Sequence, residues 1–169
     1  MNGSLLEDAF GHHVWATIRL IDACDGLSPA QLESPVPGTY GSIIDTLRHT
    51  VGADAGYLFT ISHGRYPEID EATFDLPMLR QAMQGNGPAW AELLAGDLDP
   101  AAIVVRYRDD GSTSSAPLTI RLAQAIHHGT DHRSQVCTAL TNLGNEPPSI
   151  DAWDYAFKDG RLSETPPTT

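Results

Sequence analysis

The stretch HHGTDHRSQ, residues 127–135, holds three of the seven histidines in the chain. Imidazole nitrogens are ligands that suit Zn²⁺ and Ni²⁺. His128 and His132 are four residues apart, so on a helix they lie side by side on one face. Helical metalloproteins use this spacing to place two imidazoles on one ion. His127 projects from the opposite, polar side beside Asp131, and we expect it to be a solvent-exposed histidine.

A third metal ligand has to come from another helix, and two histidines are candidates. His13 falls near the centre of the apolar face of the first predicted helix. His49 lies on a side of the second helix that is lined by small residues, which would let a neighbouring helix approach: Gly52, Ala53 and Gly56. Periodicity alone favours His13. The pair in the last helix also fits a site without metal, because buried polar groups are mostly just hydrogen-bonded.

Two charged residues accompany these histidines. Arg133 directly follows His132 and falls within the apolar face of its helix. A buried guanidinium needs carboxylates or carbonyls around it, so we expect a structural ion pair with an acid of another helix. The alternative is an anion-binding group near a pocket. Asp45 lies one turn before His49 and is the candidate acid beside the metal ligands.

Hydrophobic periodicity predicts four amphipathic helices that would position these residues, over 4–26, 42–62, 76–94 and 118–143. Ser42 with Asp45 three residues later has the pattern of a capping box. The sequence GNGP at 85–88 opposes a continuous third helix. We therefore expect a break or kink there, with Pro88 opening a second piece.

Shorter elements connect and follow the four helices. One helical turn is expected over 29–32, and a short helix over 150–157. Strand-forming residues on both sides of the turn sequence DDG predict a hairpin of 102–108 with 113–118. The predicted fold class is all-α, a four-helix bundle with a short β-hairpin before the last helix.

Length, charge and cysteine content narrow the possible functions. The 169 residues suit one domain, over 1–162, followed by a polar, proline-rich tail over 163–169 that we expect to be disordered. A net charge of −12 repels phosphate backbones and argues against nucleic-acid binding. No apolar run reaches the ~18–20 residues of a membrane helix, and the acidic N-terminus does not read as a signal peptide. Cys24 and Cys137 suit reduced, buried thiols in a cytoplasmic protein.

Two long segments of the chain resemble the DinB family, a bacterial family grouped with metalloenzymes: GTYGSIIDTLRHTVGADAGYL and LAQAIHHGTDHRSQVCTALTNLGNEPPSIDAWDY. The resemblance implies a four-helix bundle with a divalent metal held by three histidines, here His49, His128 and His132, in place of the His13 that periodicity favours. Asp131 stands where the family pattern often has histidine, and Ser134 where it often has glycine, but neither is a ligand position. His13 stands where many members carry asparagine, which suits a pocket residue or a core histidine.

The resemblance also implies a reaction. Related proteins include metal-dependent transferases that use the thiols bacillithiol or mycothiol. The expected function is therefore thiol S-transferase-like chemistry on a small thiol and an electrophilic substrate, with Zn²⁺ or Ni²⁺ as the metal and a homodimer as the assembly. Two alternatives stay open. One is a metal-dependent hydrolase, for which the sequence names no general base, and the other is a non-catalytic metal-binding stress-response protein.

Overall fold

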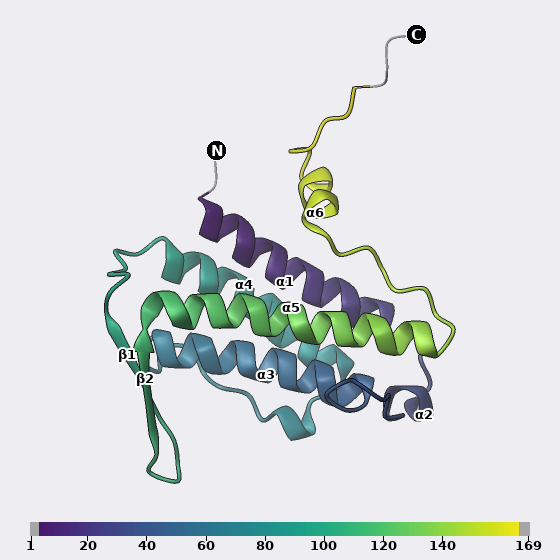
Figure 1. Cartoon of the computed structure of the whole chain (residues 1–169), viewed down its shortest axis with the longest axis horizontal. Helices are drawn as coiled ribbons and strands as arrows, with labels where there is room; N and C mark the ends of the chain where they lie inside the picture. The colour runs from purple at the N-terminus through teal and green to yellow at the C-terminus, as the bar shows by residue number, and fades with distance from the viewer. Residues whose placement is uncertain (1–3, 166–169) are drawn as a thin grey trace.

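The computed structural model describes residues 4–165, and this part of the chain is mostly helical, with one small antiparallel sheet (Figure 1). Its four long helices are α1 (Leu5–Ala23), α3 (Ile43–Ile61), α4 (Leu76–Leu94) and α5 (Leu118–Asn142). Helices α1 and α3 each pack against both α4 and α5. All four lie within a few residues of the predicted ranges, because the 3.6-residue apolar period was marked clearly in the sequence.

Serine side chains fix the beginnings of three helices. Ser4 caps α1, and Ser42 caps α3 through the predicted capping box with Asp45. Ser28 makes the same arrangement at α2 (Pro29–Leu32), the helical turn expected between the first two long helices. Each box satisfies backbone N–H groups that the first turn of a helix leaves without partners.

Helix α4 runs without interruption through Gly85 and Pro88, so the predicted break is wrong. Proline does remove one backbone hydrogen bond from the helix interior. The helix nevertheless continues, because residues on both sides of the proline are buried in the core. Met83 and Trp90 are 0% and 1% exposed. Tertiary packing here outweighs local propensity.

The core consists of two apolar clusters separated by a buried polar layer. One cluster is formed by residues that include Leu20, Leu47, Met83 and Leu140. The other includes Phe10, Leu58, Trp90 and Leu122. Between them along the helices lie four buried polar side chains, His13, Thr17, Asp54 and Arg133. The polar layer therefore sits in the middle of the helical core.

The remaining elements lie around the four long helices. Strands β1 (Ile103–Tyr107) and β2 (Thr113–Pro117) form the predicted hairpin, which contacts α3 and α5 and projects from one end of the helices (Figure 1). Helix α6 (Ala152–Lys158) packs on α1. A short 3₁₀ helix, η1 (Glu71–Thr73), was not predicted and lies against α3.

Two further predictions concern the ends and the membrane. Residues 163–165 form no helix or strand and are exposed, while 166–169 lie outside the described residues, so the disordered tail and the domain boundary stay predictions. None of the helices within residues 4–165 is both long and apolar enough to cross a bilayer.

Candidate metal centre

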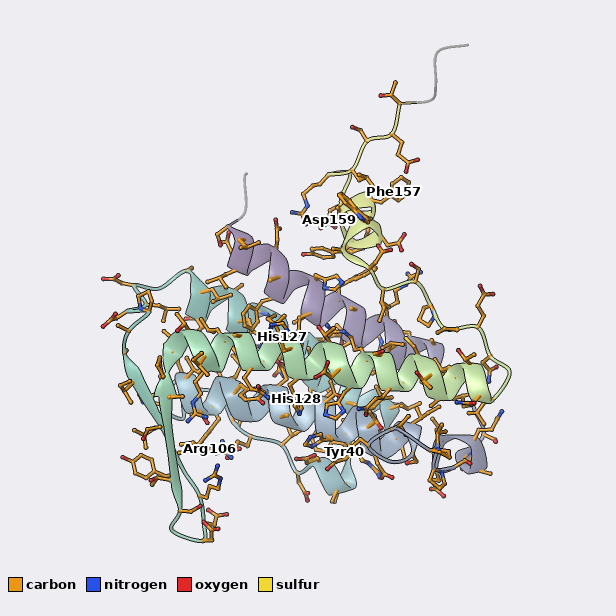
Figure 2. All side chains as sticks on the ribbon, in the orientation of Figure 1. Tyr40, Arg106, His127, His128, Phe157 and Asp159 are labelled. Carbon is orange, nitrogen blue, oxygen red and sulfur yellow. The ribbon has the colours of Figure 1, made fainter. Side chains whose placement is uncertain are left out.

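Three histidine side chains from two helices meet at one point. His49 comes from α3, while His128 and His132 come from α5. The Nε2 atom of His128 lies 3.1 Å from that of His49 and 3.2 Å from that of His132. Figure 2 shows His128 on the side of α5 that faces α3, with His127 on the other side. His127 is exposed, as predicted from the helical wheel.

The spacing of these nitrogens fits a divalent metal. Three ligands held at ~2.0–2.1 Å by a tetrahedral Zn²⁺ lie about 3.3 Å from one another. The two observed separations are close to that value, and one nitrogen of each histidine lies within 4.8 Å of the others. The donor set is all nitrogen and comes from two rigid helices. The grouping is therefore compatible with a divalent metal site that keeps a position for another ligand.

The environment keeps two of these imidazoles neutral at pH 7. Burial, reinforced by the neighbouring His132 and His49, lowers the pKa of His128 to about 4. Burial also lowers the pKa of His132, although its bond to Gln135 acts in the opposite direction. A neutral imidazole has one nitrogen with an available lone pair, which is the form that binds a metal.

A glutamine fixes the orientation of one ring. His132 Nδ1 lies 3.1 Å from Gln135 Oε1, and the same oxygen accepts a bond from the backbone N–H of Tyr40 at 2.9 Å. The Gln135 oxygen is an acceptor, so Nδ1 carries the proton and Nε2 keeps its lone pair. Hydrogen bonds of this kind orient metal-binding histidines in proteins.

Tyr40 covers one side of the histidine group. Its ring stacks on His49 with 4.2 Å between centroids and 6° between planes, and it meets His132 edge-on. The tyrosine is 56% exposed and lies in the loop before α3. Periodicity could not have found it, because a loop residue belongs to no helical face.

The acid nearest to His49 is Glu71, which the sequence analysis missed. Its Oε2 atom lies 3.5 Å from His49 Nδ1. The carboxylate also lies over Gly52, where a Cβ atom would come within 2.7 Å of Glu71 Cδ. The small residues of α3 were predicted to admit a neighbouring helix. They instead admit the segment containing η1, which supplies this acid.

Asp45, the acid proposed from the sequence, has a different task. Its Oδ2 atom accepts a bond from the backbone N–H of Ser42 at 3.3 Å, which is the capping contact at the start of α3, and another from Ser42 Oγ at 2.6 Å. It lies at the edge of an open hollow of about 590 Å³ next to His49. Asp45 therefore lies near the site, but its carboxylate is hydrogen-bonded to the N-terminus of α3.

His13 lies in the buried polar layer and does not join the other three histidines. Its Nδ1 accepts a bond from Arg133 Nη1 at 2.9 Å, and its Nε2 donates to Asp54 Oδ1 at 2.9 Å. Because one nitrogen accepts and the other donates, the ring is neutral. Of the two roles expected for His13, the core histidine is the one observed. The periodicity-based choice of His13 as the third histidine was wrong.

Arg133 is buried as predicted, but its direct partner is not an acid. Its guanidinium bonds to His13, Thr17 and Thr130, and the carboxylate of Asp54 is reached through the His13 ring. Burial lowers its pKa to about 10, against the opposing effect of Asp54, so the group stays charged at pH 7. The expected ion pair therefore becomes an Arg–His–Asp chain across three helices.

The absence of a side chain at Gly129 leaves room for the Arg–His–Asp hydrogen-bond chain beside α5. A Cβ atom at this position would lie 2.3 Å from His13 Cε1 and 2.9 Å from Arg133 Nη1. Separations this short do not occur between non-bonded atoms, so a side chain at position 129 would displace the buried His13 ring. The glycine inside HHGTDHRSQ is thus required by packing.

The two cysteines are not placed as nucleophiles. Cys24 is fully buried, and burial raises the pKa of its thiol to about 12. The pKa of Cys137 is raised by burial as well. Both therefore stay protonated at neutral pH, as expected for structural thiols.

Comparison with known proteins identifies the family. The sequence model of the DinB family matches residues 1–165 of the 169-residue chain. A search of curated proteins finds no match. The family match covers α1 to α6 and includes the three grouped histidines. The chain therefore belongs to the DinB family.

Proposed function

We propose that this protein is a metal-dependent transferase that joins a small thiol to an electrophilic substrate at His49, His128 and His132. The convergence of three Nε2 atoms, beside open hollows, is the observation that carries the proposal. Zn²⁺ or Ni²⁺ suits an all-imidazole ligand set.

A divalent ion in this position would lower the pKa of a coordinated thiol, so that the thiolate is present at neutral pH. The reaction would form a bond between the thiol sulfur and an electrophilic carbon. The bond from that carbon to its leaving group would break, and the leaving group would depart with the electron pair. The thiol proton would pass to solvent.

The chain's own residues would orient and shield the reactants. Gln135 holds the His132 ring by its Nδ1–H, and Tyr40 covers His49 from one side. Glu71 lies next to His49 Nδ1, where a carboxylate can accept a hydrogen bond from the Nδ1–H group and fix the orientation of the ring. Such contacts hold the three ligand atoms in the geometry that binding requires.

A hydrolase is the second candidate, and Glu71 is the observation in its favour. Activation of water needs a nearby base, which the sequence did not identify. Glu71 is 48% exposed and borders both hollows that meet His49. A carboxylate in that place could accept a proton from water. The remaining alternative is metal binding without catalysis.

The proposal also covers the fold, the cellular location and the oligomeric state of the protein. We assign the fold to the four-helix bundles, since the four long helices pack in the required pairs. We also propose a cytoplasmic location, because both cysteines are free thiols. We further propose a homodimer, as the family resemblance implies.

The test compares two neighbouring histidines. His128→Ala should lose bound Zn²⁺ or Ni²⁺, measured by elemental analysis after reconstitution. It should also lose conjugation of bacillithiol, mycothiol or glutathione to monochlorobimane. His127→Ala is the matched control, because that histidine is exposed on the opposite side of α5, and it should retain both properties.

Each other outcome points to a different function. Failure of the wild type to bind metal would refute both enzymatic proposals. Bound metal with ester hydrolysis, lost in Glu71→Gln, and with no thiol conjugation would favour the hydrolase. Bound metal with neither activity would leave the non-catalytic alternative.

A further inference from the structure

A groove of about 480 Å³ extends from His49 toward the hairpin. Its floor on α3 is made of small residues, Gly52, Ala53 and Gly56. Its far end lies where the hairpin meets α3 and α5, and Figure 2 labels Arg106 there. The groove thus joins the three-histidine site to a second cluster of polar side chains.

Three arginines line this far end: Arg106 and Arg108 from the hairpin strand and the residue after it, and Arg121 from α5. They are three of nine arginines in a chain whose net charge is −12. The acids that line the groove are Glu68 and Glu71. The groove is therefore locally positive on a protein that is strongly negative.

Only one of the three guanidiniums is neutralised by a close acid among residues 4–165. Arg106 Nη2 bonds to Glu68 Oε1 at 2.6 Å. Arg108 and Arg121 form no ion pair within the described chain, and their contacts are with serines and backbone carbonyls. Neither guanidinium therefore has a carboxylate within ion-pair distance among the described residues, although the pKa of Asp110 is lowered by a hydrogen-bonded serine and also by the nearby charge of Arg108.

Those two charges are also held close together. Arg108 Nη2 and Arg121 Nη2 lie 3.3 Å and 3.2 Å from the same oxygen, Ser114 Oγ. Two like charges that share one small hydroxyl group repel each other, and a bound anion would offset that repulsion. Arg121 Nε is in addition buried without a hydrogen-bond partner among the described residues. This atom is closed to solvent, so an anion in the groove would bond to the Nη atoms of Arg121 and not to Nε.

We propose that this groove binds the anionic group, a carboxylate or a phosphate, of the small-molecule substrate. Guanidinium forks bind both groups with paired, charge-assisted hydrogen bonds. Arg121 precedes His128 by two helical turns, so the anion would sit about 10 Å from the three histidines. The substrate class is then a molecule whose reactive atom and anionic group are separated by roughly that distance. Its use as a substrate rests on the proposed function, whereas the anion site does not.

A structural role for the arginines makes a different prediction. Inward-pointing charges can protect a hairpin from pairing with other chains. In that case the arginines would contribute to stability or solubility and not to anion binding. Measurement of anion affinity therefore separates the two roles.

The test is calorimetric titration of the full chain, stripped of metal, with inorganic phosphate, succinate and the neutral analogue succinamide. Wild type should bind phosphate or succinate and not succinamide, and the preferred anion identifies the group. Arg108→Gln and Arg121→Gln should each weaken that binding at least about fivefold. Arg65→Gln is the matched control, because Arg65 is exposed and pairs with Glu92 outside the groove.

His128→Ala keeps this result separate from the metal proposal. It should abolish metal binding and leave the anion affinity unchanged. If Arg121→Gln does not fold by circular dichroism, the exposed Arg108 answers the question alone. Equal anion affinity in wild type and Arg108→Gln, or binding of neither anion by wild type, would overturn the proposal.

Discussion

Replacement of Asp54 by asparagine should destabilise the protein strongly, because this carboxylate anchors the buried polar layer. Asp54 is 2% exposed. Its Oδ1 accepts bonds from His13 Nε2 at 2.9 Å and Trp90 Nε1 at 3.0 Å, and its Oδ2 accepts one from Asn86 Nδ2 at 2.7 Å. One carboxylate thus joins α1, α3 and α4, and through His13 it reaches Arg133 on α5.

The size of the effect follows from these contacts. Asparagine keeps the shape but replaces one acceptor oxygen by an NH₂ group, so at least one buried donor loses its partner, at a cost of about 1–3 kcal/mol. The change also removes the negative charge that compensates Arg133. Breaking a direct buried charge pair costs about 3–5 kcal/mol, which is an upper bound here because Arg133 reaches Asp54 through the His13 ring, and the two effects overlap. We expect a total of about 4 kcal/mol, or a decrease in Tm of about 8–16 °C.

Urea unfolding followed by circular dichroism measures this free energy. Asp22→Asn is the matched control, since it also removes one negative charge but breaks only a half-exposed pair with Arg80. Exposed pairs contribute about 0–1 kcal/mol. Asp54→Asn with no larger effect than Asp22→Asn would refute the reasoning. A second check is Arg133→Met combined with Asp54→Asn, which should cost less than the two single changes added together.

Three further predictions concern packing, metal affinity and pH. Gly129→Ala should lower the free energy of unfolding by about 1–3 kcal/mol, because the added Cβ would displace His13. Gly85→Ala in α4, where a Cβ meets nothing within 4 Å, should raise it by about 0.5–1 kcal/mol. Thermal denaturation of the two variants checks both effects. Gln135→Ala should weaken Zn²⁺ affinity about 10–100-fold in chelator competition, because the imidazole that it orients is released; unchanged affinity would contradict the assigned role. The pKa of Cys24 is raised from 9 to about 12, so the folded state holds this proton longer than the unfolded state. The stability from Cys24 is then complete below pH 9 and decreases between about pH 9 and 12, a decrease that unfolding of Cys24→Ala should lack.

Much of the fold could be predicted from local sequence patterns. Apolar periodicity located the four long helices, Ser42 with Asp45 marked a helix start, and the DDG turn marked the hairpin. These features depend on residues close together in the chain, so the sequence contains the whole signal. Pro88 is the exception, since its helix continues only because the residues around it are buried by other elements.

The same distinction between local patterns and long-range contacts applies to the candidate site. The sequence alone determined that His128 and His132 share a helical face, because a spacing of four residues fixes that geometry in any α-helix. Helical periodicity did not determine which histidine joins them, and only the resemblance to the DinB family named His49. His13 and His49 both lie on faces of their helices that could be turned inward. Which of them meets His128 and His132 depends on whether α1 or α3 packs against the part of α5 that carries this pair.

In the tertiary structure one of the two candidate histidines has other hydrogen-bond partners, and the second lies beside the pair. His13 is committed to Arg133 and Asp54 in the buried layer, while His49 faces His128 with its Nε2 available. Tyr40 reaches the same point from a loop and Glu71 from the short 3₁₀ helix η1, and neither segment is long enough to have a periodic pattern. Contacts between residues distant in sequence are set by the packing of whole helices and loops. The sequence therefore determined the histidine pair and, through the family resemblance, named its partner, while only the tertiary structure decided how His49 reaches the pair and which residues surround it.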